Sequence, residues 1–263
     1  MSGGYSGANG GASQTVLGAF RDGGTQVLLG YSHASGRQLD NLGTVDTIST
    51  GRTRPNLLTS NDQGVLAKLS VRPAAGHTFS AMVEGRDQQV DSDILRLSGA
   101  LPKVTSVRGE DNARRVRTSV EWEHAPKGAP LYDRLTARLY RQDASTQNYN
   151  FQTRSNTSNT CSAASGTGSN CTIESDFRVD QSNTGTSVQL EKGLDVGGLT
   201  HVLTYGADFG RTRVEELRDA RIWNTTKNTF TKSLAGANYP LRDFVTGKTD
   251  TRGLLLQDDT SGP

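Results

Sequence analysis

The feature that most constrains this chain is a two-residue alternation of apolar and polar side chains. In the segment 114–124, Val116, Val120 and Trp122 alternate with charged or hydroxyl-bearing residues. Successive residues of a β-strand point to opposite faces of a sheet, so this spacing predicts strands with one apolar and one polar face. No segment shows a convincing apolar stripe at the spacing of a helix. The sequence therefore predicts an all-β fold.

Nine segments carry this alternation, and most are long. A typical globular strand has about 5–6 residues, whereas a strand that crosses a membrane has about 9–11. Most of the predicted strands reach about ten residues or more, as a membrane-spanning strand requires. They cover 13–21, 25–34, 62–72, 77–87, 114–124, 133–144, 173–194, 199–213 and 247–258.

The connections between these segments alternate between short and long. The short ones are expected at 22–24, 73–76, 125–132 and 195–198, and the long ones at 35–61, 88–113, 145–172 and 214–246. Structureless loops beyond about 12–15 residues are uncommon in compact soluble domains. Short turns at one end and long loops at the other are typical of outer-membrane barrels. The pattern predicts an antiparallel up-and-down transmembrane β-barrel.

Charged residues occupy many of the polar positions on the predicted strands. They would be costly in the core of a sandwich but not beside a water-filled lumen. We therefore expect Arg117, Glu121, Arg138 and Asp208 to face the lumen, with apolar side chains toward lipid. Aromatic residues toward strand ends would lie at the membrane interfaces: Tyr31, Trp122, Tyr140 and Phe209. A soluble antiparallel sandwich with one solvated face is the alternative, because its strands also alternate.

Nine strands make an incomplete set, since single-chain bacterial barrels normally have an even number. An open sheet would also present two bare edges. The start, Met1 followed by SGGYSGANGGAS, has neither the cationic nor the apolar region of a signal peptide. We interpret residues 1–263 as one partial barrel domain, about nine strands of a larger barrel, without a plug domain.

Composition excludes other classes. Lys and Arg total 29 against 27 Asp and Glu, a net charge of +2, which gives no argument for a nucleic-acid partner. The longest aliphatic run is Leu254–Leu256, far below the roughly 20 residues of a transmembrane helix.

No arrangement of residues predicts catalysis, a metal site or a cofactor site. The string Thr246–Thr249 ends like a phosphate-binding loop, but Arg242 stands where the first glycine is required. The four histidines show no metal-binding spacing, although His33 lies near the long-loop end as a possible haem or metal contact. We therefore expect no enzyme activity. Cys161 and Cys171 predict a local disulfide, which would either staple a loop or stiffen a ligand-facing one.

Several segments resemble the barrel of TonB-dependent outer-membrane receptors, and most closely the haem/haemoglobin receptor branch. The resemblance is spread over most of the chain and is carried by Gly4–Asn9, Val27–His33, Lys68–Pro73, Arg114–Trp122, Leu139–Gln142 and Thr251–Asp258. It implies a barrel of about 22 strands with a plug. It also implies import of haem, a haemoprotein or another iron compound, and location in outer-membrane lipid. TonB would contact an N-terminal region that this chain lacks.

The resemblance assigns no ligand-binding residue. The haem-branch histidines lie in the plug and in a later loop between FRAP-like and NPNL-like segments, and neither string occurs here. Haem is therefore expected as transported cargo, not as a resident cofactor. Two other functions stay open. One is a siderophore or other nutrient receptor of the same family, and the other is a surface or soluble β-sandwich adhesin.

Overall fold

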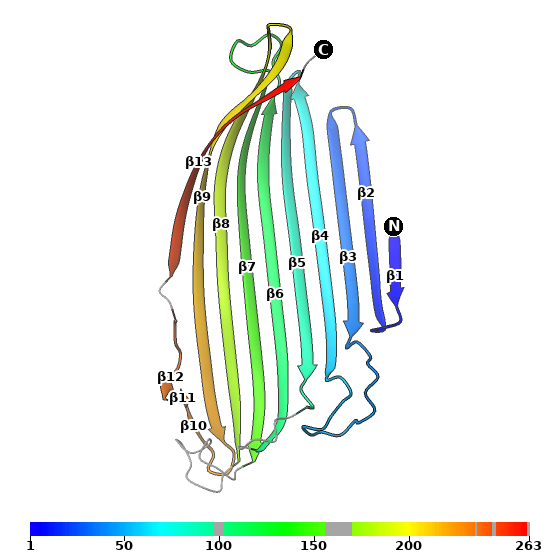
Figure 1. The fold of residues 1–263 in the computed structure, drawn as a ribbon, viewed down its shortest axis with the longest axis vertical. Coiled ribbons are helices and arrows are strands. Elements are labelled where there is room, and N and C mark those ends of the chain that lie inside the picture. Colours follow the sequence, from blue (N-terminus) through cyan, green and yellow to red (C-terminus); the bar gives the residue numbers. More distant parts are fainter. Residues whose placement is uncertain (97–102, 156–169, 235, 244–245, 262–263) are drawn as a thin grey trace.

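The computed structural model describes residues 1–96, 103–155, 170–234, 236–243 and 246–261. These residues form strands and connections, and no helix among them is long and apolar enough to cross a membrane. Eleven strands make one antiparallel up-and-down sheet, shown in Figure 1. The predicted all-β, up-and-down antiparallel fold is confirmed. The long strands are β2 (Gly11–Asp22), β3 (Thr25–Arg37), β4 (Leu57–Ala74), β5 (His77–Asp93), β6 (Lys103–His124), β7 (Arg134–Ser155), β8 (Cys171–Val196), β9 (Leu199–Asn224) and β13 (Gly247–Ser261).

Each long strand pairs with the next along the chain. The longest pairing joins β8 to β9, from Val196 opposite Leu199 to Cys171 opposite Asn224. At one edge of the sheet, β1 (Ser2–Ser6) pairs with the start of β2, and at the other edge β13 pairs with β9. All nine strands expected from the alternation are present.

Most strands are longer than the alternation predicts, and the large extensions point toward the long connections. The predicted segment 114–124 begins at Lys103 in the structure, 133–144 continues to Ser155, and 199–213 continues to Asn224. These extensions, such as Ser145–Ser155 with the sequence STQNYNFQTRS, are largely polar on both faces. Backbone hydrogen bonds with neighbouring strands hold these extensions in the sheet. Because such bonds do not depend on side-chain type, the extensions show no apolar–polar alternation.

The long connections are therefore shorter than expected. Between the long strands they cover 38–56, 94–102, 156–170 and 225–246. The ends of β3, β5, β7 and β9 that lead into them lie at one end of the sheet, the lower end in Figure 1, and the last connection then runs up along β9 to the start of β13. The predicted strict alternation of lengths is wrong at one place, because 94–102 is no longer than 125–133 at the opposite end. The other short connections, 23–24, 75–76 and 197–198, are tight turns as predicted.

Four short strands were not expected from the sequence. β1 has the sequence SGGYS, which carries no alternation. β10 (Thr229–Thr231), β11 (Ser233–Leu234) and β12 (Ala237–Asn238) belong to the connection after β9. This connection contributes Leu234 to a small core, whose buried members are Cys171, Ile173 and Ile222. Among the described residues the only other buried hydrophobic residue is Ala220, two residues before Ile222 on β9, so the long sheet has no central core.

Candidate functional site

One face of the sheet carries a continuous band of exposed apolar side chains, which we call the apolar band. Its members are Val16, Phe20, Leu29, Tyr31, Val65, Leu69, Phe79, Val83, Val120, Leu139, Val188, Phe209, Leu254 and Leu256. They come from β2 through β9 and from β13, and each is at least 36% exposed. Contiguous apolar patches of more than a few hundred Å² are rare on soluble monomers. We therefore expect another apolar phase or partner to cover this band.

The strand register aligns the band. One row of directly opposed residues crosses eight strands in the order Phe20, Val27, Leu69, Ala81, Val120, Leu139, Thr186 and Phe209. Because directly opposed residues lie on the same face, these side chains form one stripe. We call this face the band face and the opposite one the charged face.

The apolar band runs obliquely to the rows of paired residues. A second row is apolar at Leu29 and Val83 but reaches Arg141 on β7 and Arg211 on β9. Relative to the rows of paired residues, the band thus shifts toward the short-turn side from β3 to β13, where Val188, Leu254 and Leu256 belong to rows beyond that of Phe209. An oblique band means that the strands are tilted relative to it, as the strands of membrane barrels are tilted relative to the membrane plane.

Aromatic and histidine rings border the band near the short turns. Phe79 and Trp122 stack with centroids 6.2 Å apart, and His77 and His124 stack at 4.2 Å. The Trp122 Nε1–H donates to Nδ1 of His77 over 3.3 Å, and His124 Nδ1 bonds the Tyr132 hydroxyl at 2.9 Å. Rings with one apolar and one polar side suit the boundary between hydrocarbon and water.

The structure places all four predicted lumen residues on the charged face. Glu121, Arg138 and Asp208 belong to one row of paired residues, and Arg117 lies on β6 four residues before Glu121. Arg138 Nε donates to Glu121 Oε2 over 2.8 Å. The carboxylate of Asp208 lies over Gly253 of β13, where an added Cβ would be 2.2 Å from its Oδ1. The sequence thus identified the face of these residues correctly, and their role in a lumen stays a prediction.

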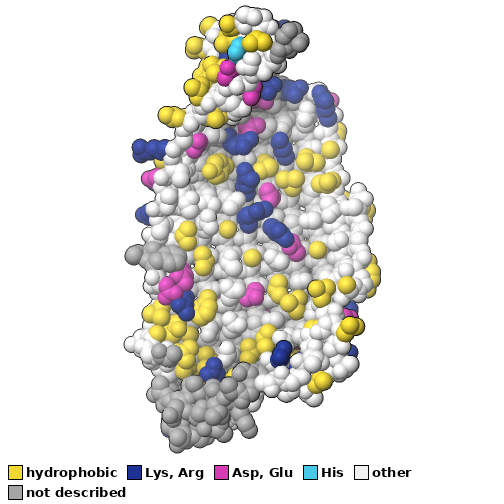
Figure 2. Space-filling view, viewed as in Figure 1, with side chains coloured by type: hydrophobic (Ala, Val, Ile, Leu, Met, Phe, Trp, Pro, Cys, Tyr) yellow, Lys and Arg dark blue, Asp and Glu magenta, His cyan; other side chains and the backbone are white. Residues whose placement is uncertain are grey.

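Ion pairs cross the charged face from β4 to β7. Arg86 Nε bonds Asp62 Oδ1 at 3.1 Å, and Arg115 Nη2 bonds Glu84 Oε1 at 2.5 Å, followed by the Arg138–Glu121 pair. Figure 2 looks onto this face and shows positive and negative side chains in an oblique row over the central strands. Exposed pairs of this kind contribute about 0–1 kcal/mol each. Their consequence is a hydrated, nearly neutral surface opposite the apolar band.

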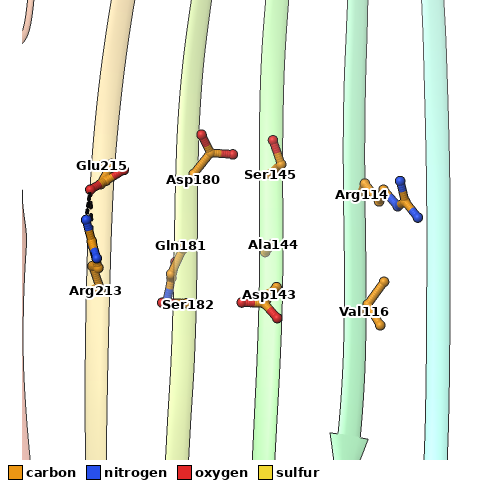
Figure 3. A pocket seen from close by; sticks show the side chains of 10 residues that line it. All are labelled: Arg114, Val116, Asp143, Ala144, Ser145, Asp180, Gln181, Ser182, Arg213 and Glu215. Atoms are coloured by element: carbon orange, nitrogen blue, oxygen red, sulfur yellow. Dashed lines mark hydrogen bonds and ion pairs between the residues drawn. The ribbon is translucent and has the colours of Figure 1, made fainter.

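A wide polar recess of about 560 Å³ lies on the band face beyond the apolar band, toward the long connections. Figure 3 shows the side chains that line it on four neighbouring strands, among them Arg114, Asp143, Asp180 and Arg213. Arg213 Nε donates to Glu215 Oε1 over 3.0 Å. The band face is therefore apolar only over part of its height, and charge limits the band on this side.

The connection 38–56 is organised around one buried arginine. The Arg52 side chain is 3% exposed, bonds Asp46 Oδ1 at 2.6 Å and donates through Nη2 to the Pro55 carbonyl oxygen at 2.9 Å. Arg54 Nη1 bonds the other oxygen of Asp46 at 2.9 Å. Hydrogen bonds from Arg54 and then Arg52 lower the pKa of the Asp46 carboxyl below its ordinary value of 3.8. Asp46 thus forms ion pairs with two arginine side chains at this end of the sheet.

Acidification is expected to loosen this connection. Because the pKa of Asp46 is lower in the folded than in the unfolded chain, its stabilisation is present above the ordinary carboxyl value and disappears as pH falls through the folded value. We expect lower hydrogen-exchange protection, corrected for intrinsic rates, of the Thr53 and Arg54 amides, which bond the Val45 carbonyl, between about pH 5 and pH 3. The variant Asp46→Asn should have low protection at every pH, and the control Asp40→Asn should behave as the native chain. Equal acid response of both variants would contradict this role of Asp46.

The structure bears differently on the predicted disulfide and on His33. Cys171 is disulfide-bonded, and Cys161, its predicted partner, lies outside the described residues. His33 lies within β3, directly opposite Gln14 and Gln63, and not in a long connection. The described residues contain no group of three or more His, Cys, Asp or Glu that could hold a metal ion.

Tyr140 does not lie where its predicted interface role requires. It is directly opposite Ser119 and Gly185 on the charged face, whereas Trp122, Phe209 and Tyr31 are on the band face. Its ring lies against buried Gly185, where an added Cβ would be 2.5 Å from Oη. The sequence contains a signal for this position, because Tyr140 is one residue out of phase with Leu139.

Comparisons with protein-family models and with curated proteins find no match to this chain.

Proposed function

We propose that this chain forms part of the wall of an outer-membrane transport barrel, with the apolar band toward lipid and the charged face toward a water-filled lumen. The observation that carries the proposal is the exposed apolar band, aligned across β2 to β9 and β13 and opposed by ion pairs. A spanning strand must satisfy its backbone through its neighbours, as every central strand here does.

The strand lengths support the same proposal. β8 and β9 each have 26 residues, whereas about 9–11 residues of a tilted strand cross the hydrocarbon layer. The strands therefore continue well beyond the band, toward the long connections. In this proposal the long connections lie outside the cell, and the ring-bordered side with the tight turns faces the periplasm.

Within the class of transport barrels, we propose a TonB-dependent receptor for haem, haemoglobin or another iron compound. The segment resemblances support this assignment, and the charged face provides a polar wall beside which a plug and a polar cargo could lie. A siderophore or other nutrient receptor would use the same wall. A soluble adhesin with a sandwich fold would need a second sheet over the apolar band, and the described residues place their eleven-stranded sheet with this face open.

Partition between water and lipid tests the transport-wall proposal. The purified chain, refolded from denaturant, is expected to aggregate in buffer and to fold in detergent micelles or lipid vesicles. Once folded, it should remain with the vesicles after an alkaline carbonate wash. A folded, monodisperse monomer in buffer without detergent would contradict the proposal and favour the adhesin.

The DNA on both sides of the reading frame tests the receptor assignment. Coding sequence for a plug and a TonB box upstream, and for further alternating strands downstream, is the expected result. The later loops would then be searched for haem-binding histidines, whose absence favours the siderophore alternative. Unrelated neighbouring genes on both sides would contradict the assignment to this family.

A further inference from the structure

Arg117 forms no ion pair with the acidic residue directly opposite it on the neighbouring strand. Glu84 is directly opposite Arg117 on β5, yet Glu84 bonds Arg115 at 2.5 Å. The next acid along β6 on the same face, Glu121, is bonded to Arg138. Among the residues that the structure describes, no acidic side chain forms an ion pair with Arg117. The charged face therefore contains one half-buried guanidinium whose neighbouring acids are already taken.

This guanidinium opens into a recess of about 310 Å³ that no acidic side chain lines. Its wall consists of neutral hydrogen-bonding groups from four neighbouring strands. Thr184 and Arg211 border it as well, but both belong to the row of Arg141 on the band face, where Arg211 Nε bonds Asp250 Oδ1 at 2.7 Å. The other polar side chains that line it on the charged face are Tyr140, Gln142, Asn183, Thr212 and Thr251.

Two glycines shape the recess. Gly185 lets the Tyr140 ring lie flat on the sheet, since a Cβ there would be 2.5 Å from the phenol oxygen. Gly210, directly opposite Gly185 on β9, leaves room for the Thr251 hydroxyl, which would be 2.7 Å from an added Cβ. The phenol and the threonine hydroxyl thus border the same hollow as Arg117.

We propose that this recess binds the oxyanion group of a small organic or inorganic anion, a carboxylate or a phosphate. A guanidinium binds either group through two parallel, charge-assisted hydrogen bonds. The surrounding amides and hydroxyls can donate to the remaining oxygens, and the absence of acids from the lining removes the repulsion that an anion would meet elsewhere on this face. The inference goes beyond the proposed transport function, because it concerns the charged face alone and holds whether or not the band face contacts lipid.

Equilibrium dialysis of the folded full chain in detergent micelles tests the site, with citrate and inorganic phosphate as probes and glycerol as the neutral comparison. We expect saturable binding of at least one anion and none of glycerol. Arg117→Gln should weaken anion binding at least tenfold. The matched control Arg21→Gln removes the same charge from the same face at β2, outside the recess, and should bind as the native chain does. The tighter of the two probes identifies the preferred oxyanion.

A measurement on the native chain keeps the test independent of whether the variants fold. Phenylglyoxal modifies accessible arginines, and mass spectrometry identifies which ones. Citrate or phosphate should protect Arg117 from modification and leave Arg21 unprotected. Equal binding by native chain and Arg117→Gln, equal protection of both arginines, or no saturable anion binding by the folded chain would each overturn the proposal. None of these results bears on vesicle partition, so the failure of this site and of the transport wall can be distinguished.

Discussion

Leu139→Arg is expected to weaken the folded state in lipid by about 2–4 kcal/mol, the cost of an arginine on the lipid face near the membrane midplane. Leu139 lies on β7 in the central row of the apolar band and is 58% exposed. Unfolding by urea from lipid vesicles, followed by tryptophan fluorescence, measures the change. If this face were open to water, the same substitution at an exposed position would cost little.

The matched control for this prediction is Thr136→Arg. Thr136 lies three residues earlier on the same strand but on the charged face, opposite Glu123, so a new guanidinium there would meet water and a carboxylate. We expect its unfolding midpoint to stay close to that of the native chain. Equal destabilisation by the two substitutions would contradict the assignment of the two faces, whichever environment the protein occupies.

Ile222→Ala is expected to destabilise the end of the sheet at the long connections by about 2–5 kcal/mol, the usual cost of truncating a fully buried isoleucine. Ile222 is 2% exposed, lies directly opposite Ile173 and packs in the small core to which Leu234 belongs. The effect should be local. Native-state hydrogen exchange should show earlier opening of the segment β10–β12, where the Tyr239 amide bonds the Lys232 carbonyl.

Val179→Ala provides the comparison for the buried isoleucine. Val179 belongs to β8, as Ile173 does, but is 41% exposed. Its truncation leaves no cavity, and we expect a change below about 1 kcal/mol. If Ile222→Ala opened the whole sheet and not only its end, the small core would be part of one cooperative unit, contrary to the expectation of a separately opening region.

Side-chain periodicity was sufficient to predict the class of the fold and, within the alternating segments, the face of each residue. Because successive strand residues alternate between faces, Val120 and Glu121 had to lie on opposite sides once the segment was a strand. The same argument placed Arg117, Arg138 and Asp208 together. It also predicted all nine long strands, since each has a stretch in which one face is apolar and the other polar.

Periodicity could not predict how far the strands extend or which charges meet. The Ser145–Ser155 part of β7 is held by backbone pairing with β6 and β8, and its side chains are largely polar on both faces, so no alternation marks it. Whether Glu84 bonds Arg115 or the directly opposed Arg117 depends on side-chain geometry across two strands, information that no single strand contains. The sequence by itself therefore determined the strands and their two faces, because these depend on local alternation. Only the tertiary structure decided the strand ends, the ion pairs and the recess beside Arg117, because these depend on register between segments distant in the chain.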